Sequence, residues 1–184
     1  PPGGKTMANS LAPSASQRWH KWVEEHPVGG LALIGVIATQ LGTYFGYCFN
    51  AIGLPQLPWP AYNGALIAGA AGDKGASWGS PMAQYFTGQS MHFVNGIVFC
   101  ILFGVIAHKA IPVANHVVKG LVYGVIMTII SIGFLVPYAY APKQGYGLFS
   151  FDTPNGWKLP AGVLLWHLIY GAVIGLLYQP KNND

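Results

Sequence analysis

The chain has 184 residues, of which 52% are apolar and 8% are charged, and its formal net charge is +4. A soluble domain carries roughly 25% charged residues, so this composition excludes a water-soluble globular protein. The basic residues lie scattered near the ends of predicted helices instead of forming a patch, which argues against nucleic-acid binding. We therefore predict an integral membrane protein, anchored to lipid head groups by these residues.

The N-terminal part divides into two predicted segments. Residues 1–18 are rich in Ser, Pro and Ala and are predicted to form a tail. Residues 19–27 combine Trp19, Trp22 and Val23 with charged neighbours. This pattern predicts a short amphipathic helix lying in the membrane interface, where Trp is common. An alternative is that this helix docks a partner.

Four long stretches without Asp, Glu, Lys or Arg occupy most of the remaining chain. A helix needs about 20 apolar residues to cross a bilayer, and runs such as GIVFCILFGVIA do not alternate as membrane β-strands do. We predict an all-α integral membrane protein, in which residues 28–180 form one four-transmembrane-helix bundle and residues 181–184 a C-terminal tail. The predicted spans are 29–51, 90–111, 116–138 and 161–178.

The basic residues predict the orientation of these spans. Four spans place both termini on the side of the short connection between the second and third spans. The basic residues are Lys5, Arg18, Lys21, Lys109, Lys119 and Lys181 on that side, and Lys74, Lys143 and Lys158 on the other. By the positive-inside rule, both termini are predicted to be cytoplasmic.

The two long connections both lie on the predicted outer side. The first, residues 52–88, is apolar and aromatic, so we expect it to pack on the outer face with a short helix near residues 64–70, or against another subunit. Large apolar surfaces are rarely left in water and aromatic residues anchor interfaces. The predicted partner contacts are Trp59, Tyr62 and Trp78. The alternative is that this segment dips into the lipid interface.

A histidine followed four residues later by glycine occurs three times, as HFVNG at 92–96, HVVKG at 116–120 and HLIYG at 167–171. Residues four apart share a helix face. Small residues at this spacing let two membrane helices approach closely. The predicted helix-packing residues are Gly42, Gly46, Gly96, Gly104, Gly120, Gly124, Gly171 and Gly175.

The three histidines are predicted to lie at different depths. His92 is expected near the outer boundary, His116 at the inner boundary close to His108, and His167 well inside the last span. The preferred interpretation is structural, with His167 bonded to a neighbouring helix and the other two acting as caps. The alternative is that His92 and His167 face each other and hold a haem or a chlorophyll-type pigment.

Metal binding and catalysis receive no support from the sequence. The predicted spans contain no Asp or Glu that could complete a metal site, and no GxSxG, HExxH or phosphate-loop motif occurs. Cys48 and Cys100 are expected at different depths and so do not predict a disulfide. We predict no enzyme, no metal and no bound cofactor, but we expect bound lipids.

The first span with its small residues, the segment MHFVNGIVFCILFG and the segment WHLIYGAVIGLLY together resemble small, uncharacterised four-helix bacterial membrane proteins. The resemblance covers the spans and not the long connections. It implies a four-helix bundle in a bacterial inner membrane, and it implies no activity and no functional residue.

Three functions remain open at this point. The leading prediction is a non-catalytic accessory subunit of a larger respiratory, photosynthetic or oxidase complex, with other membrane subunits or its own copies as partners. The second is an electron-transfer or light-harvesting subunit that binds haem or pigment through His92 and His167. The third is a small channel or carrier.

Overall fold

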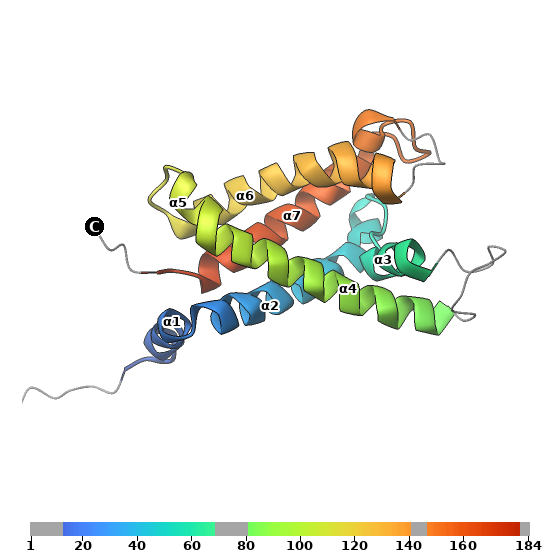
Figure 1. The fold of residues 1–184 in the computed structure, drawn as a ribbon. Helices are drawn as coiled ribbons and strands as arrows, with labels where there is room; N and C mark the ends of the chain where they lie inside the picture. Colours follow the sequence, from blue (N-terminus) through green and yellow to red (C-terminus); the bar gives the residue numbers. More distant parts are fainter. Residues whose placement is uncertain (1–12, 69–80, 141–146, 181–184) are drawn as a thin grey trace, which may run out of the picture.

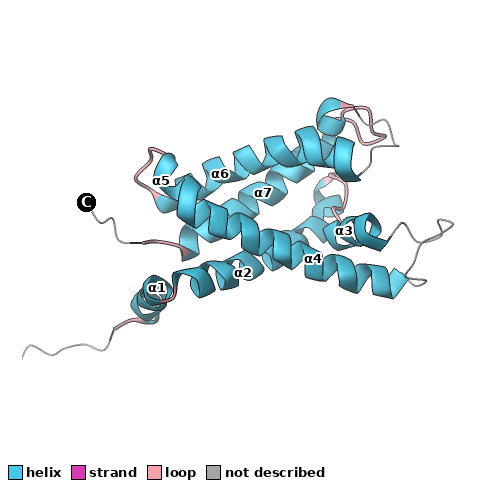
Figure 2. Ribbon diagram, in the orientation of Figure 1, coloured by secondary structure: helices cyan, strands magenta, loops and turns pink. Residues whose placement is uncertain are grey.

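The computed structural model describes residues 13–68, 81–140 and 147–180, which form helices and connecting turns. Figure 2 shows that this part of the chain contains no strand. Four helical segments are long and apolar enough to cross a membrane. They are Pro27–Tyr47, Met82–Ala110, His116–Tyr138 and Lys158–Leu177. The prediction of a helical chain with four such segments is confirmed for the described residues.

α1, Ala15–Glu25, begins within the segment that was predicted to be a tail. The reason is a capping box. The Ser14 hydroxyl accepts a hydrogen bond from the Gln17 backbone nitrogen at 3.2 Å, and the Gln17 side chain accepts one from the Ser14 nitrogen at 2.8 Å. These bonds satisfy donors that a helix N-terminus otherwise leaves free. Trp19 then ties α1 to the end of the last span, because its Nε1 donates to the Leu177 carbonyl at 2.9 Å.

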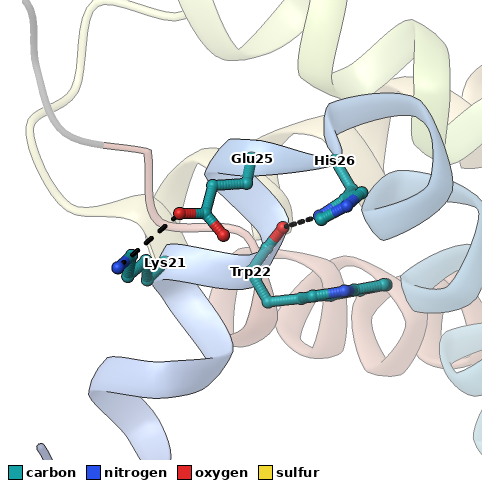
Figure 3. A network of polar contacts seen from close by, with 4 residues as sticks. All are labelled: Lys21, Trp22, Glu25 and His26. Carbon is teal, nitrogen blue, oxygen red and sulfur yellow. Dashed lines mark hydrogen bonds and ion pairs between the residues drawn. The ribbon is translucent and has the colours of Figure 1, made fainter.

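Figure 3 shows the polar side of α1 and its junction with the next helix. Lys21 Nζ lies 3.7 Å from Glu25 Oε1, but the side chains are 73% and 55% exposed. An exposed ion pair of this kind contributes little to stability. His26 Nδ1 lies 3.1 Å from the Trp22 carbonyl oxygen, and the two rings stack with centroids 5.5 Å apart. The junction is therefore held by local contacts.

α2, Pro27–Tyr47, is followed by the 3₁₀ turn η1, Phe49–Ile52. Pro27 stands at the start of α2, where its missing N–H breaks no helical bond. Gly53 ends η1 with a φ of 79°, a left-handed conformation that glycine adopts readily. The sequence predicts that the first span ends at residue 51. In the structure it ends at Tyr47.

α3, Trp59–Ala68, packs along the beginning of α4, Pro81–Leu102. Glycine makes this approach possible. An ideal Cβ on Gly88 would overlap the carbonyl oxygen of Pro60 and would lie 2.5 Å from the nitrogen of Gly64. Backbone therefore touches backbone, and α3 lies against α4.

The second span is longer than the sequence predicts. α4 continues through a π-helical turn, η2 at Phe103–Ala107, and then through α5, His108–Ala110. Within η2, an ideal Cβ on Gly104 would lie 2.6 Å from Leu31 Cδ1 of α2. The span begins at Met82 and not at residue 90, because the polar first turns of α4 are covered by α3.

α6, His116–Ile130, starts with a side-chain cap. Asn115 Oδ1 accepts a hydrogen bond from the Val118 nitrogen at 3.1 Å, as is common at helix N-termini. The helix continues as the π-helical η3, Ser131–Tyr140, which contains Pro137. A proline removes one donor from the hydrogen-bond ladder, so this end of the span departs from regular α-geometry.

α7, Lys158–Leu177, follows the short 3₁₀ turn η4, Leu148–Ser150, and runs beside α6 (Figure 1). The predicted glycines of the two helices face each other in antiparallel register. An ideal Cβ on any of the four would overlap a carbonyl oxygen of the opposite helix. The facing pairs are His116 with Gly175, Gly120 with Gly171, and Gly124 with His167.

The predicted packing glycines of α2 have a different neighbour. An ideal Cβ on Gly42 would lie 2.8 Å from Trp166 Cε2, and one on Gly46 would lie 3.1 Å from Trp166 Cδ1. These glycines therefore make room for an indole ring and not for another backbone. The close approach between α2 and α4 occurs at Gly35, whose ideal Cβ would lie 2.7 Å from the Gly96 carbonyl oxygen.

The described connections divide between two ends of the molecule. Figure 1 shows α1, α5 and the end of α7 at one end, and α3 with residues 147–157 at the other. At the first end, His108 Nε2 lies 2.8 Å from His116 Nδ1, and the two rings stack with centroids 5.1 Å apart. Lys119 Nζ donates to the His108 carbonyl at 2.6 Å, which caps a helix end. The expectation that His116 lies close to His108 is confirmed.

Candidate functional site

A cavity of about 60 Å³ lies among α2, α3, α4, α7 and the junction of α6 with η3. A cavity needs roughly 10–15 Å³ to hold one water molecule, so this cavity has room for on the order of five. Its wall combines hydrogen-bonding and aromatic side chains. The lining residues are Thr39, Trp59, Asn63, His92, Asn95, Gly96, Phe99, Met127, Ser131, Leu135, Trp166, His167 and Tyr170.

His92 is held from two sides. Its Nε2 lies 2.9 Å from Thr43 Oγ1 on α2, and its Nδ1 lies 3.3 Å from the amide nitrogen of Asn63 on α3. Because an amide nitrogen can only donate, Nδ1 is the acceptor and Nε2–H donates to Thr43. Asn95 extends the network by donating to Asn63 Oδ1 at 3.5 Å. These bonds join three helices through one imidazole.

His167 is held mainly by its own helix. Its Nδ1 lies 2.9 Å from the Val163 carbonyl oxygen and 3.3 Å from Thr128 Oγ1 on α6. The Thr128 hydroxyl donates to the Gly124 carbonyl at 2.9 Å. Because the Val163 carbonyl oxygen can only accept, Nδ1–H is the donor toward it. In the uncharged ring the lone pair therefore lies on Nε2. The sequence-based interpretation that His167 bonds to a neighbouring helix agrees with its contact to Thr128.

Trp166 lies between the two histidines. Its ring centroid is 5.4 Å from that of His92 and 5.2 Å from that of His167. Tyr170 stacks on the same indole at 5.8 Å with an interplanar angle of 11°. The Tyr170 hydroxyl donates to the Gly96 carbonyl at 2.7 Å and so joins α7 to α4. Trp166 therefore contacts three other residues of the cavity wall, His92, His167 and Tyr170.

His92 lies deeper than the sequence predicts, and this change brings it level with His167. At about 1.5 Å per residue, His92 is roughly 17 Å from the start of α4 and His167 roughly 14 Å from the start of α7. Both helices start at the same end of the molecule (Figure 1). His92 is therefore not an interfacial cap. His116 lies with His108 near the opposite end and does not line the cavity.

The geometry does not favour a haem or pigment between His92 and His167. Both ring nitrogens of His92 already make hydrogen bonds, so ligation of iron or magnesium would break one of them. The indole of Trp166 contacts both imidazoles, and the free space is far smaller than a tetrapyrrole. Among the described residues, no group of three His, Cys, Asp or Glu could hold a metal ion.

The three residues predicted to contact a partner differ in their exposure and in whether the structure describes them. Trp59 is only 7% exposed and lies in the chain's own core, which corrects its assignment to a contact surface. Its burial follows from the packing of α3 on α4. Tyr62 is 45% exposed, and Trp78 lies outside the described residues.

Sequence reasoning missed Asn63 and Trp166. Asn63 is the polar residue of an otherwise apolar segment beside Gly64, and this isolation was a usable signal. Trp166 precedes His167 directly, but nothing in its spacing indicates that two glycines of α2 receive its ring.

Comparisons with family models, with curated proteins and with solved structures found no match to this chain.

Proposed function

We propose that this protein is a non-catalytic accessory subunit of a larger membrane complex, such as a respiratory, photosynthetic or oxidase assembly. Its partners in this proposal are other membrane subunits or its own copies. The support comes from one surface of α4, which belongs to the second candidate span, the most exposed of the four.

The outer face of α4 consists of Val94, Val98 and Leu102, which follow one another at every fourth position and are all exposed. They lie on the second candidate span, where only 28% of the most apolar stretch is buried, against 44–56% in the other three candidate spans. Further exposed residues continue this spacing in both directions along the span, but they wind around the helix, because each step of four residues turns it by about 40°. They are Met82, Phe86, Ser90 and Ile106.

This face suits a neighbouring helix. Lipid gives no hydrophobic drive for association, so helices associate through van der Waals packing of their side chains. Val94 and Val98 lie on this face, and β-branched side chains have few rotamers to lose on contact. We propose that a helix of another subunit, or of a second copy, lies along this face.

Site-specific photocrosslinking tests the accessory role. A photoreactive amino acid in place of Val94 or Val98 is expected to give a protein–protein adduct in native membranes. The same amino acid in place of Leu41, which is 40% exposed on α2, provides the control and should react with lipid. Mass spectrometry of the adduct identifies the partner as another subunit or a second copy. Lipid adducts alone at all three positions would contradict the proposal.

We further propose that the protein lies in a bacterial inner membrane with both termini in the cytoplasm. Arg18, Lys21, Lys109 and Lys119 lie at the end that carries α1 and α5 (Figure 1). Among the described residues, Lys158 is the basic side chain at the other end. This asymmetry supports the orientation that the positive-inside rule predicts.

Reporter fusions test this orientation. An enzyme that is active only outside the cytoplasm should stay inactive when fused after Asp184 and become active when inserted near Lys74. A second reporter, active only inside the cytoplasm, should show the opposite pattern at the same two sites and controls for expression. The reverse result with both reporters would place the termini outside.

A further inference from the structure

We propose that the cavity beside His92 and His167 binds an uncharged, planar carbonyl compound from the lipid phase, of the quinone class. This inference is independent of the accessory role, because it concerns the interior of the chain and not the outer face of α4.

The lining favours a ligand without charge. None of the thirteen lining residues is Asp, Glu, Lys or Arg. An ion in a buried site without an opposite charge pays a large desolvation penalty. An uncharged molecule with a few hydrogen-bonding atoms avoids this penalty.

The polar groups on the wall suit a carbonyl acceptor. Thr39 and Ser131 supply hydroxyl donors from α2 and η3, and Asn95 supplies an amide donor from α4. The Thr39 hydroxyl is fully buried and makes no hydrogen bond to any described group of the protein. A buried hydroxyl without a partner is costly, and a ligand carbonyl would supply the acceptor. The three donors stand on three different helical segments, which suits a molecule with more than one carbonyl.

The apolar part of the wall suits a flat ring of small size. Trp166 and Tyr170, which stack on one another, line the cavity, and Phe99 adds a third ring. Planar conjugated groups pack favourably against aromatic rings. The free space of about 60 Å³ is less than half of the roughly 150 Å³ of an engineered cavity that binds benzene, so side chains of the wall must move when a ring binds. Met127 also lines the cavity, and the flexible methionine side chain adjusts to a ligand's shape.

The position of the cavity suits a lipid-soluble ligand. It lies among helices that are long and apolar enough to cross a membrane, well inside α4 and α7. Ser131, which lines the cavity, stands where α6 changes to the π-helical η3. Such changes in helix geometry are frequent at functional sites.

Isothermal titration calorimetry of the detergent-solubilised protein with duroquinone tests this inference. Duroquinone is a fully substituted benzoquinone, which limits addition to the exposed thiol of Cys48. Durene, the hydrocarbon of the same outline without carbonyls, is the matched control ligand. We expect saturable binding of duroquinone and at least about tenfold weaker binding of durene, as loss of hydrogen bonds implies. Equal affinities, or no saturable binding of duroquinone, would overturn the proposal.

Variants locate the binding. Thr39→Val keeps the side-chain shape and removes the hydroxyl, so duroquinone should bind about tenfold more weakly, whereas Thr39→Ser should bind as the parent does. Ser150→Ala removes a buried hydroxyl that does not line the cavity and should leave affinity unchanged. Binding that is the same in Thr39→Val as in the parent would show that duroquinone sits elsewhere and would refute the assignment.

Discussion

Gly171→Leu should destabilise the protein more than any substitution on an exposed helix face. An ideal Cβ at this position already overlaps the carbonyl oxygen of Gly120, and the rest of a leucine has no space between the two backbones. α6 and α7 would have to separate along the paired glycines. Overpacking of a core costs about 1–3 kcal/mol, and more where backbone must move, so we expect about 3 kcal/mol or more.

Thermal unfolding in a mild detergent, followed by circular dichroism, measures this effect. Gly171→Ala should give a smaller loss in the same direction, because a methyl group also overlaps the opposite carbonyl. Leu176→Ala is the control, since Leu176 is 54% exposed on the same helix and truncation there leaves the interface intact. A Gly171→Leu variant that melts with the parent would show that α6 and α7 do not pack through these glycines.

Trp166→Ala should produce the second large loss of stability. The indole fills the space beside Gly42 and Gly46, and it contacts the rings of His92 and Tyr170. Truncation therefore opens a cavity between α2, α4 and α7 together. Phe or Trp to Ala in a protein core costs about 3–5 kcal/mol. We expect the lower end, about 3 kcal/mol, because a detergent micelle, like lipid, also gives the exposed indole apolar surroundings.

The matched control for this prediction is Trp157→Ala. It removes the same side chain from a position that is 63% exposed. The two variants should therefore differ clearly in melting temperature under identical detergent conditions. Similar melting temperatures for both would mean that Trp166 does not join the three helices as described.

The sequence by itself determined where the long apolar helices lie and which glycines of α6 and α7 are free for close contact. Charge-free runs of this length predict spans because a buried charge is costly in lipid. The four-residue spacing of His116, Gly120 and Gly124 predicts one helix face, and the same spacing recurs from His167. The pairing of these two faces in antiparallel register comes from the structure, because the same spacing also occurs in α2 and α4.

The tertiary structure decided where the second span begins, because that helix start depends on contact with another segment of the chain. The first turns of α4 carry polar residues such as Gln84 and Gln89, so hydropathy alone places the span too late. Contact with α3 covers these turns and brings His92 to the depth of His167. The same contact buries Trp59, which a reading of isolated segments assigned to the surface.

Tertiary structure also decided what each small residue faces. Glycine spacing shows that a helix face is flat, but it does not specify whether a backbone or a ring approaches. Gly42 and Gly46 receive Trp166, whereas the unpredicted Gly35 receives the backbone of Gly96. Hydrogen bonds from Asn63 and Thr43 to His92 likewise join residues far apart in the chain. Such contacts depend on the relative rotation and depth of whole helices, which local periodicity does not determine.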